Sequence, residues 1–205
     1  MQILKINNDN PQKRLISIVV EKLKEGGIIA YPTDTIYGIG CDIFHKGATE
    51  RLYQIKGKDQ NKPLSFLCSD LTDITTYASV SNQNFKIMRR LVPGPYTFIL
   101  EASRIVPKIM VTKRKTVGIR VPDNNICHEI IKTLGHPIIT TSVRNSEDEL
   151  FNDADEIAER LKSVIDIVVD GGRINPHHST VIDLTGEVPE IIREGKGDFS
   201  SLMEA

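Results

Sequence analysis

The amino-acid sequence predicts an α/β fold built on a mixed sheet. Runs rich in β-branched residues, such as 27–31 and 116–121, are typical of buried strands, and between them apolar residues recur at helical spacing. Several strand-like runs follow one another without a helix between them, so we expect a mixed sheet. No repeat and no Gly-, Ser- or Pro-rich linker divides the chain. We therefore expect one domain over 1–205, with its motif-bearing core at about 10–198.

The first half of the chain gives two amphipathic helices among short strands. Asn10 and Pro11 are expected to cap and start a helix that Gly26 ends, and a second helix runs from Ala48 to Lys56. The strands are expected at 3–6, 27–31, 41–44 and 64–68.

The second half of the chain carries clearer helix boundaries. Ser81 is expected to cap a helix ending before Pro93–Gly94, Asn124 or Asn125 to cap one that Gly135 ends, and Asp153 to cap one that runs through Leu161. Strands are expected at 96–100, 116–121, 137–141, 167–169, 180–184 and 190–193, the last two joined as a hairpin at 185–186.

Composition limits the kind of protein. The net charge of −1 argues against a protein that coats nucleic acid along its whole surface, yet residues 56–120 hold twelve Lys or Arg against four Asp or Glu, so this region can attract anions. Residues 145–170 have the opposite balance, nine acidic against two basic. Three scattered cysteines indicate neither a disulfide framework nor a zinc site. With no apolar run of spanning length, we expect a cytoplasmic protein without membrane contact.

The stretch Pro32 to Gly40 is the central candidate for a binding turn. A buried strand ends there in Pro-Thr-Asp-Thr-Ile-Tyr-Gly-Ile-Gly, which would place hydroxyls and a carboxylate on an exposed turn. In an extended conformation Thr33, Thr35 and Tyr37 would point to one side. Gly38 and Gly40 would let a second backbone or a ligand approach closely. A plain strand end and turn is the alternative interpretation of this stretch.

Six further punctuated stretches follow it in order, and each is weak alone. Together they resemble the YrdC/YciO family, whose best known members are threonylcarbamoyl-adenylate synthases, and the resemblance runs from about Gly26 to Gly197. It implies a single domain with a twisted open mixed sheet flanked by helices and with a concave, positively charged cavity. The stretches are 56–58 with 62–65, 93–97, 118–122, 140–142, 179–183 and 192–195.

The resemblance implies a catalytic set of Lys56, Lys58 and Ser142. In the family a Lys-x-Arg motif and a Ser-x-Asn motif meet at the site, and here Lys58 stands where the arginine would be. Lysine keeps the charge but loses the planar fork that binds two oxygens at once. In the second motif Arg144 takes the asparagine position and Asn145 follows one place late, a pattern closer to the YciO branch.

The same resemblance implies a reaction and its ligands. ATP with Mg²⁺, L-threonine and bicarbonate would give threonylcarbamoyl-adenylate and pyrophosphate, for modification of a tRNA adenosine, and cations would hold the triphosphate oxygens. The Mg²⁺ would arrive with ATP, and no metal site within the protein is expected. The implied binding residues are Thr33, Thr35, Arg120, Thr141, Asn145, Ser179, Thr180 and Arg193.

A binding module for tRNA or double-stranded RNA is the competing interpretation. The basic residues that would follow a phosphate backbone are Arg89, Arg90, Lys113, Arg114 and Lys115, although a solvated charged face is the commoner role of such runs. His177–His178 is more typical of a wet loop than of a metal pair. The sequence contains none of the common nucleotide-binding and hydrolase motifs, so it gives no support to those classes of protein.

Overall fold

The computed structural model describes residues 1–56, 64–110, 112–142 and 150–198. One mixed sheet runs through these residues in the order β1-β9-β2-β3-β8-β4-β7-β6-β10-β11, with β5 paired to β6. The mixed α/β architecture predicted from the sequence is confirmed. The strands are β1 (Gln2–Lys5), β2 (Ile29–Tyr31), β3 (Gly38–Asp42), β4 (Ser65–Leu67), β5 (Ala78–Ser79), β6 (Tyr96–Ala102), β7 (Thr116–Arg120), β8 (Ile138–Ser142), β9 (Ile167–Asp170), β10 (Thr180–Asp183) and β11 (Glu190–Arg193).

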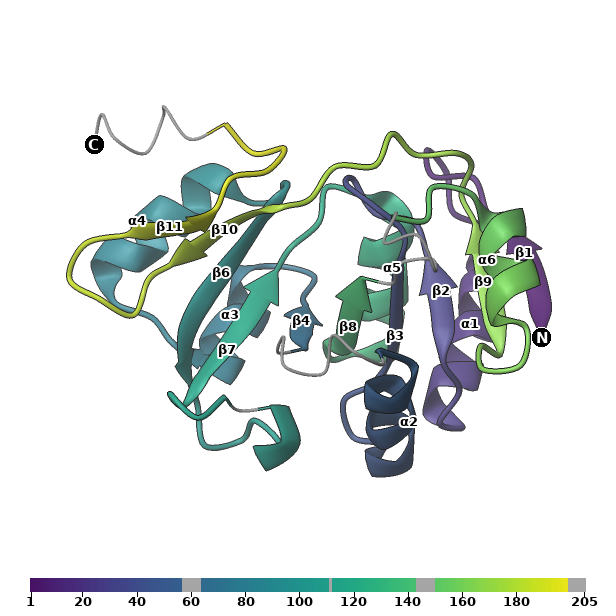
Figure 1. The fold of residues 1–205 in the computed structure, drawn as a ribbon, viewed down its shortest axis with the longest axis horizontal. Helices are drawn as coiled ribbons and strands as arrows, with labels where there is room; N and C mark the ends of the chain where they lie inside the picture. Colours follow the sequence, from purple (N-terminus) through teal and green to yellow (C-terminus); the bar gives the residue numbers. More distant parts are fainter. Residues whose placement is uncertain (57–63, 111, 143–149, 199–205) are drawn as a thin grey trace.

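Helices cover both faces of this sheet. One apolar core joins the sheet to α2, α3, α4 and α6, and a second core joins the opposite face to α1 and α5. Figure 1 shows the result as two arms, with β6, β7, β10 and β11 in one and β1, β2 and β9 in the other. The helices are α1 (Lys13–Lys24), α2 (Lys46–Lys56), α3 (Leu71–Tyr77), α4 (Asn82–Leu91), α5 (Asn125–Leu134) and α6 (Ala154–Leu161), with a short 3₁₀ helix at Lys108–Met110.

Local capping sets most helix boundaries as expected. The side chains of Ser81, Asn124 and Asp153 each accept a hydrogen bond from the first turn of the following helix, and Gly135 ends α5 with φ +88°. The sequence did not distinguish Asn124 from Asn125 as the cap of α5, and the structure shows that it is Asn124. These contacts satisfy amide groups that have no partner within the helix, which explains why they could be predicted locally.

The largest differences from the prediction concern four elements. Helix α1 begins at Lys13 and not at Pro11. Asn10 lies in a preceding bend, where its backbone amide donates a hydrogen bond to Oδ1 of Asn7. Helix α3 and strand β5 were not predicted, although Asp70 caps α3 through the amides of its first turn. Strand β3 begins at Gly38 instead of residue 41, since it pairs with β2 on one side and β8 on the other. Two ladders of hydrogen bonds override the local turn signal.

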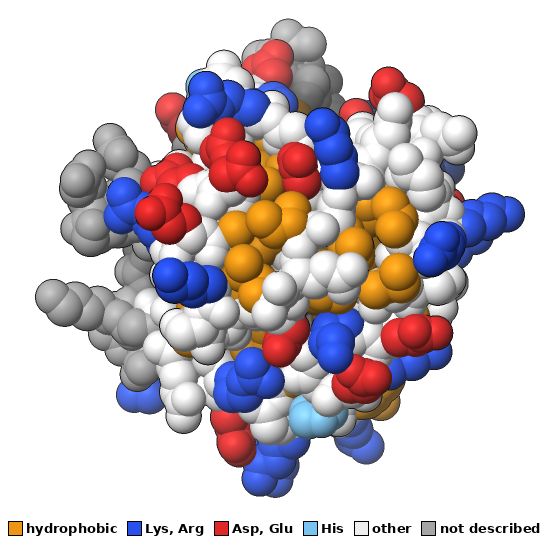
Figure 2. All heavy atoms as spheres, turned by 90° about the vertical axis from the view of Figure 1, so that its right-hand side faces the viewer, with side chains coloured by type: hydrophobic (Ala, Val, Ile, Leu, Met, Phe, Trp, Pro, Cys, Tyr) orange, Lys and Arg blue, Asp and Glu red, His pale blue; other side chains and the backbone are white. Residues whose placement is uncertain are grey.

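Strand β1 forms an exposed edge of the sheet. It is only four residues long, it ends in Lys5, and the side chain of Ile3 is 45% exposed. Figure 2 shows the end of the molecule that is on the right in Figure 1, where apolar side chains lie among Lys, Arg, Asp and Glu of both signs. Short length and charge limit the addition of a further strand at such an edge. No helix of the described residues is long and apolar enough to cross a membrane.

Candidate functional site

The central strands carry two different faces. Side chains of one parity, such as Phe66, Phe98 and Ile119, are fully buried in the core shared with α3 and α4. Side chains of the other parity are small or polar, as at Ser65, Thr97 and Gly118, and they line a cavity. The period of two in a strand therefore builds the core and the cavity from the same segments.

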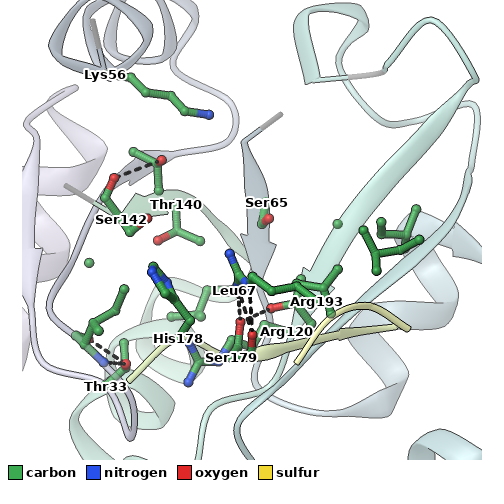
Figure 3. Close-up of a pocket in the computed structure, with 18 of the residues that line it drawn as sticks. Thr33, Lys56, Ser65, Leu67, Arg120, Thr140, Ser142, His178, Ser179 and Arg193 are labelled. Carbon is green, nitrogen blue, oxygen red and sulfur yellow. Dashed lines mark hydrogen bonds between the residues drawn. The ribbon is translucent and has the colours of Figure 1, made fainter. Parts of the chain in front are cut away.

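This cavity has a volume of about 480 Å³. Its lining comes from β3, β4, β6, β7, β8, β10 and β11, from the end of α2 and from connecting segments. The chain between β9 and β10, which carries His178 and Ser179, crosses from one arm of the sheet to the other (Figure 1). Two arginines and one lysine, from β7, β11 and the end of α2, face a wall rich in hydroxyl groups (Figure 3). The lining residues are Thr33, Ile36, Gly38, Lys56, Ser65, Leu67, Thr97, Ile99, Thr112, Thr116, Gly118, Arg120, Thr140, Thr141, Ser142, His178, Ser179, Val181, Ile192 and Arg193.

A bend after β2 forms one end of the cavity. The hydroxyl of Thr33 accepts hydrogen bonds from the amides of Thr35 and Ile36, both at 3.1 Å, and donates to the Ile36 carbonyl at 2.6 Å. Because these residues bend, the three side chains do not share a side: Thr33 lines the cavity and Thr35 is fully buried. Tyr37 donates to the carbonyl of Gly172 at 2.8 Å. The turn predicted for this stretch is present as a bend at residues 34–36, but most of its side chains are buried and not exposed as expected.

Arg120 enters the cavity from β7 and forms an ion pair with Asp34. Both side chains are only 10% exposed. Charged side chains are rarely buried unless they are paired with an opposite charge. Asp34 was not among the site residues that we predicted, although it lies in the Pro32–Gly40 stretch, because nothing in a local pattern indicates a partner 86 positions away.

Arg193 forms the other arginine contact of the cavity. Its guanidinium donates to the backbone carbonyl of Ser179 at 3.2 and 2.9 Å and to the Ser179 hydroxyl at 3.2 Å. That hydroxyl also shares a hydrogen bond of 2.9 Å with Thr97. The next residue, Thr180, is fully buried and its hydroxyl donates to the carbonyl of Gly197, so its place is structural and outside the cavity lining.

The predicted catalytic set is only partly described. Lys56, the last residue of α2, and Ser142, at the end of β8, both line the cavity, as does Thr141 (Figure 3). Lys58, Arg144 and Asn145 lie outside the described residues. The structure thus brings together Thr33, Lys56, Arg120, Thr141, Ser142, Ser179 and Arg193, and the role of each stays a prediction.

Six polar residues of the lining were not assigned to the site from the sequence: Ser65, Thr97, Thr112, Thr116, Thr140 and His178. Ser65 and Thr97 each lie between two buried apolar residues, a signal that could have placed them on the polar face. His178 was interpreted as part of a wet loop, yet its side chain lines the cavity (Figure 3). Among the described residues, no three His, Cys, Asp or Glu side chains are grouped so that they could hold a metal.

Burial dominates the ionisation of the groups beneath the cavity. The hydroxyl of Tyr31, hydrogen-bonded to Thr140, has its pKa raised by desolvation, and burial likewise raises the pKa of Cys41 to about 12. Cys68 and Cys127 are buried core residues, as predicted. Thiols with raised pKa values are poor nucleophiles at neutral pH, so these cysteines serve packing.

The basic residues proposed for RNA lie toward the two ends of β7, and their role stays a prediction. Arg89 and Arg90 end α4, and the amide of Gly94 just beyond them donates to the carbonyl of Val121, at the carboxyl end of β7. The run 113–115 precedes the other end of β7, next to the cavity residues Thr112 and Thr116. Arg89 instead borders a second cavity, of about 470 Å³, at the carboxyl ends of β4 and β7.

The fold and its cavity define an α/β protein with a basic, hydroxyl-lined pocket on an open mixed sheet. The chain belongs to the Sua5/YciO/YrdC family, whose model, described as "Telomere recombination", matches residues 21–195. The resemblance seen in the sequence motifs is thereby confirmed.

Relatives of two kinds are found in this family. The chain is 41% identical to "Uncharacterized protein YciO" of Escherichia coli K12 over 98% of its length and 99% of that protein. It is 32% identical to "Putative threonylcarbamoyl-AMP synthase" of Methanocaldococcus jannaschii, over 92% of this chain and 89% of that protein.

Solved structures agree with the fold. The crystal structure of E. coli YciO matches with a TM-score of 0.94 and 40% identity, covering 98% of each chain. The crystal structure of Pyrococcus abyssi Sua5 complexed with L-threonine matches with a TM-score of 0.87 and 28% identity, over 95% of this chain and 58% of that one. The family thus contains proteins named as synthases beside YciO proteins that carry no assigned activity.

Proposed function

We propose that this protein is an L-threonylcarbamoyladenylate synthase acting in tRNA threonylcarbamoyladenosine modification. The substrates are ATP, with its Mg²⁺, L-threonine and bicarbonate, and the products are threonylcarbamoyl-AMP and pyrophosphate. The observation that carries the proposal is one cavity that gathers Lys56, Arg120 and Arg193 with a wall of hydroxyl groups. Relatives named threonylcarbamoyl-AMP synthase, and a relative crystallised with L-threonine, support it.

The chemistry requires positioning and charge neutralisation. The amine of threonine and bicarbonate form a carbamate and water; a carbamate oxygen then attacks the α-phosphorus of ATP, and pyrophosphate leaves. Negative charge moves toward the leaving group, so fixed cations stabilise the transition state more than the ground state. Lys56 and Arg193 are suited to the phosphate oxygens, and hydroxyls such as those of Ser142 and Thr141 can orient polar groups of the substrates. The reaction has no covalent enzyme intermediate.

Pyrophosphate release that depends on both L-threonine and bicarbonate tests this proposal. Lys56→Met should lower that rate on the order of 10²-fold, the effect of removing one charge stabiliser from an active site. Lys24→Met is a matched control, since Lys24 is the last residue of α1 as Lys56 is of α2, and it lies outside the cavity. Release that does not require threonine, or equal rates for the two variants, would contradict the proposal.

Binding of tRNA or double-stranded RNA is a second candidate, favoured by one observation. The exposed run Lys113–Lys115 forms a turn between two residues of the cavity lining, so it could contact a phosphate backbone at the cavity mouth. Neutralising the three side chains should reduce the slope of log affinity against log salt by about three and weaken all RNA sequences alike. Unchanged RNA affinity at every salt concentration would contradict this candidate.

A further inference from the structure

The ion pair between Asp34 and Arg120 is incompletely satisfied, although it is buried. Asp34 Oδ2 and Arg120 Nε are both inaccessible to solvent, and neither has a hydrogen-bond partner among the described residues. Buried polar groups are nearly always paired, so each exception requires an explanation. A buried ion pair is also weak support for stability, because desolvation offsets most of the attraction. The pair therefore invites a functional explanation.

Hydrogen bonds from three other segments hold the backbone around Asp34. Its own carbonyl accepts a hydrogen bond of 2.6 Å from Lys196 Nζ, and the carbonyl of Thr35 accepts one of 3.1 Å from the amide of His177. On the other side Cys127 Sγ donates to the carbonyl of Pro32 at 3.0 Å. Contacts from α5, from the chain before β10 and from the chain after β11 thus fix where the carboxylate lies.

Among the described residues, the Arg120 side chain has no comparable set of contacts. Its long side chain leaves β7 on the polar face of the sheet, and its cavity-lining neighbours on that face include Gly118 and Leu67. Neither of these offers a hydrogen-bond acceptor on its side chain. An arginine has several rotatable bonds, and fixing them costs conformational entropy unless a partner is already in place. Asp34 is the one described side chain with a recorded hydrogen bond to the Arg120 guanidinium.

We propose that Asp34 is a positioning residue: it holds the Arg120 guanidinium at the Thr33 end of the cavity and so sets where an anionic group of the ligand binds (Figure 3). The inference rests on the proposed function only in taking an anionic ligand for this cavity. The anionic group is either a carboxylate or a phosphate, and both accept hydrogen bonds from the planar fork of a guanidinium. Asp34 acts through Arg120 and does not itself touch the ligand.

A double-mutant cycle on ligand binding tests this. The affinities of L-threonine and of inorganic pyrophosphate are measured by calorimetry for wild type, Asp34→Asn, Arg120→Gln and the double variant. For whichever probe Arg120→Gln weakens, Asp34→Asn alone should weaken binding about tenfold, as loss of one charge-assisted hydrogen bond would. In the Arg120→Gln background the same change should alter affinity by less than about twofold. The probe that responds identifies a carboxylate or a phosphate as the group bound.

Two further variants separate positioning from folding. Asp34→Glu keeps the charge and should restore part of the lost affinity. Asp42→Asn is the matched control, because Asp42 is also a buried carboxylate, 3.6 Å from His136, and lies outside the cavity lining. It should leave both affinities unchanged. If Asp34→Asn alone does not fold, Asp34→Glu replaces it in the cycle, and its effect on affinity should be larger in the wild-type background than in the Arg120→Gln background.

Several results would overturn the inference. They are an equal loss from Asp34→Asn in both backgrounds, an unchanged affinity in folded Asp34→Asn, and a wild-type protein that binds neither probe. The readout needs no turnover, so failure of the proposed function is seen separately. A protein that binds a probe with the expected coupling but releases no threonine-dependent pyrophosphate would contradict the synthase proposal alone.

Discussion

The two arginines of the cavity are held in different ways. Arg120 is buried and paired with the carboxylate of Asp34, whereas Arg193 is exposed and its hydrogen bonds to Ser179 go to a neutral carbonyl and a neutral hydroxyl. The first arginine belongs to the structure as much as to the site, since removing it leaves a buried charge. The second is exposed, so we expect its substitution to cost less stability. Substituting Arg120 should therefore lower the free energy of unfolding strongly, whereas substituting Arg193 should lower ligand affinity with little loss of stability.

The largest expected effect is on the stability of Arg120→Met. The change leaves the carboxylate of Asp34 buried without its cation, which typically costs about 3–5 kcal/mol of unfolding free energy. Arg193→Met should change this free energy by no more than about 1 kcal/mol, because exposed positions tolerate substitution. Urea unfolding of both variants gives the comparison. Equal losses would mean that the two arginines do not differ as their burial indicates.

Next in size is the effect of Thr33→Val on the bend that carries Asp34. Valine leaves two buried amides without their acceptor, so the unfolding free energy should fall by about 1–3 kcal/mol. Thr35→Val is the matched control, since the recorded partner of the Thr35 hydroxyl is that of Thr33 and a methyl group has nearly the same shape. It should cost less than Thr33→Val in the same urea experiment. A larger loss at Thr35 would show that the bend is held otherwise.

Arg193→Met should act on affinity. Loss of a charge-assisted contact to a phosphate is expected to weaken binding of a triphosphate about tenfold or more. Arg90→Met, at the end of α4 and outside the cavity lining, controls for loss of one positive charge. Calorimetric titration with ATP and Mg²⁺ measures both. An equal loss of ATP affinity in Arg90→Met and Arg193→Met would contradict a direct role of Arg193 in binding the ligand.

The smallest expected effect belongs to Ser179→Ala. Arg193 keeps its two hydrogen bonds to the backbone carbonyl of residue 179 and loses only the one to the hydroxyl. ATP affinity should fall by about two- to threefold, in line with one modest hydrogen bond. A loss as large as that of Arg193→Met would instead indicate that the hydroxyl contacts the ligand itself.

Local chemistry explains which parts of the fold were predictable. The caps at Ser81, Asn124 and Asp153 act within three residues, so the sequence carries the whole interaction. Strand β3 was misplaced because its hydrogen bonds go to β2 and β8, and the β8 partners lie about a hundred positions away. Helix α3 was missed since its threonine-rich segment has weak helix propensity and its packing against the sheet compensates.

For the site, the family motifs could be recognised in the sequence, and they led to seven of the residues that line the cavity, Thr33 and Arg193 among them. The burial of Thr35 and Thr180 and the pairing of Asp34 with Arg120 could be seen only in the folded protein. They follow from the order of the strands in the sheet. Which strands become neighbours, and which face a helix leaves uncovered, depends on hydrogen bonds and packing between segments far apart in the chain, which no local pattern of residues specifies.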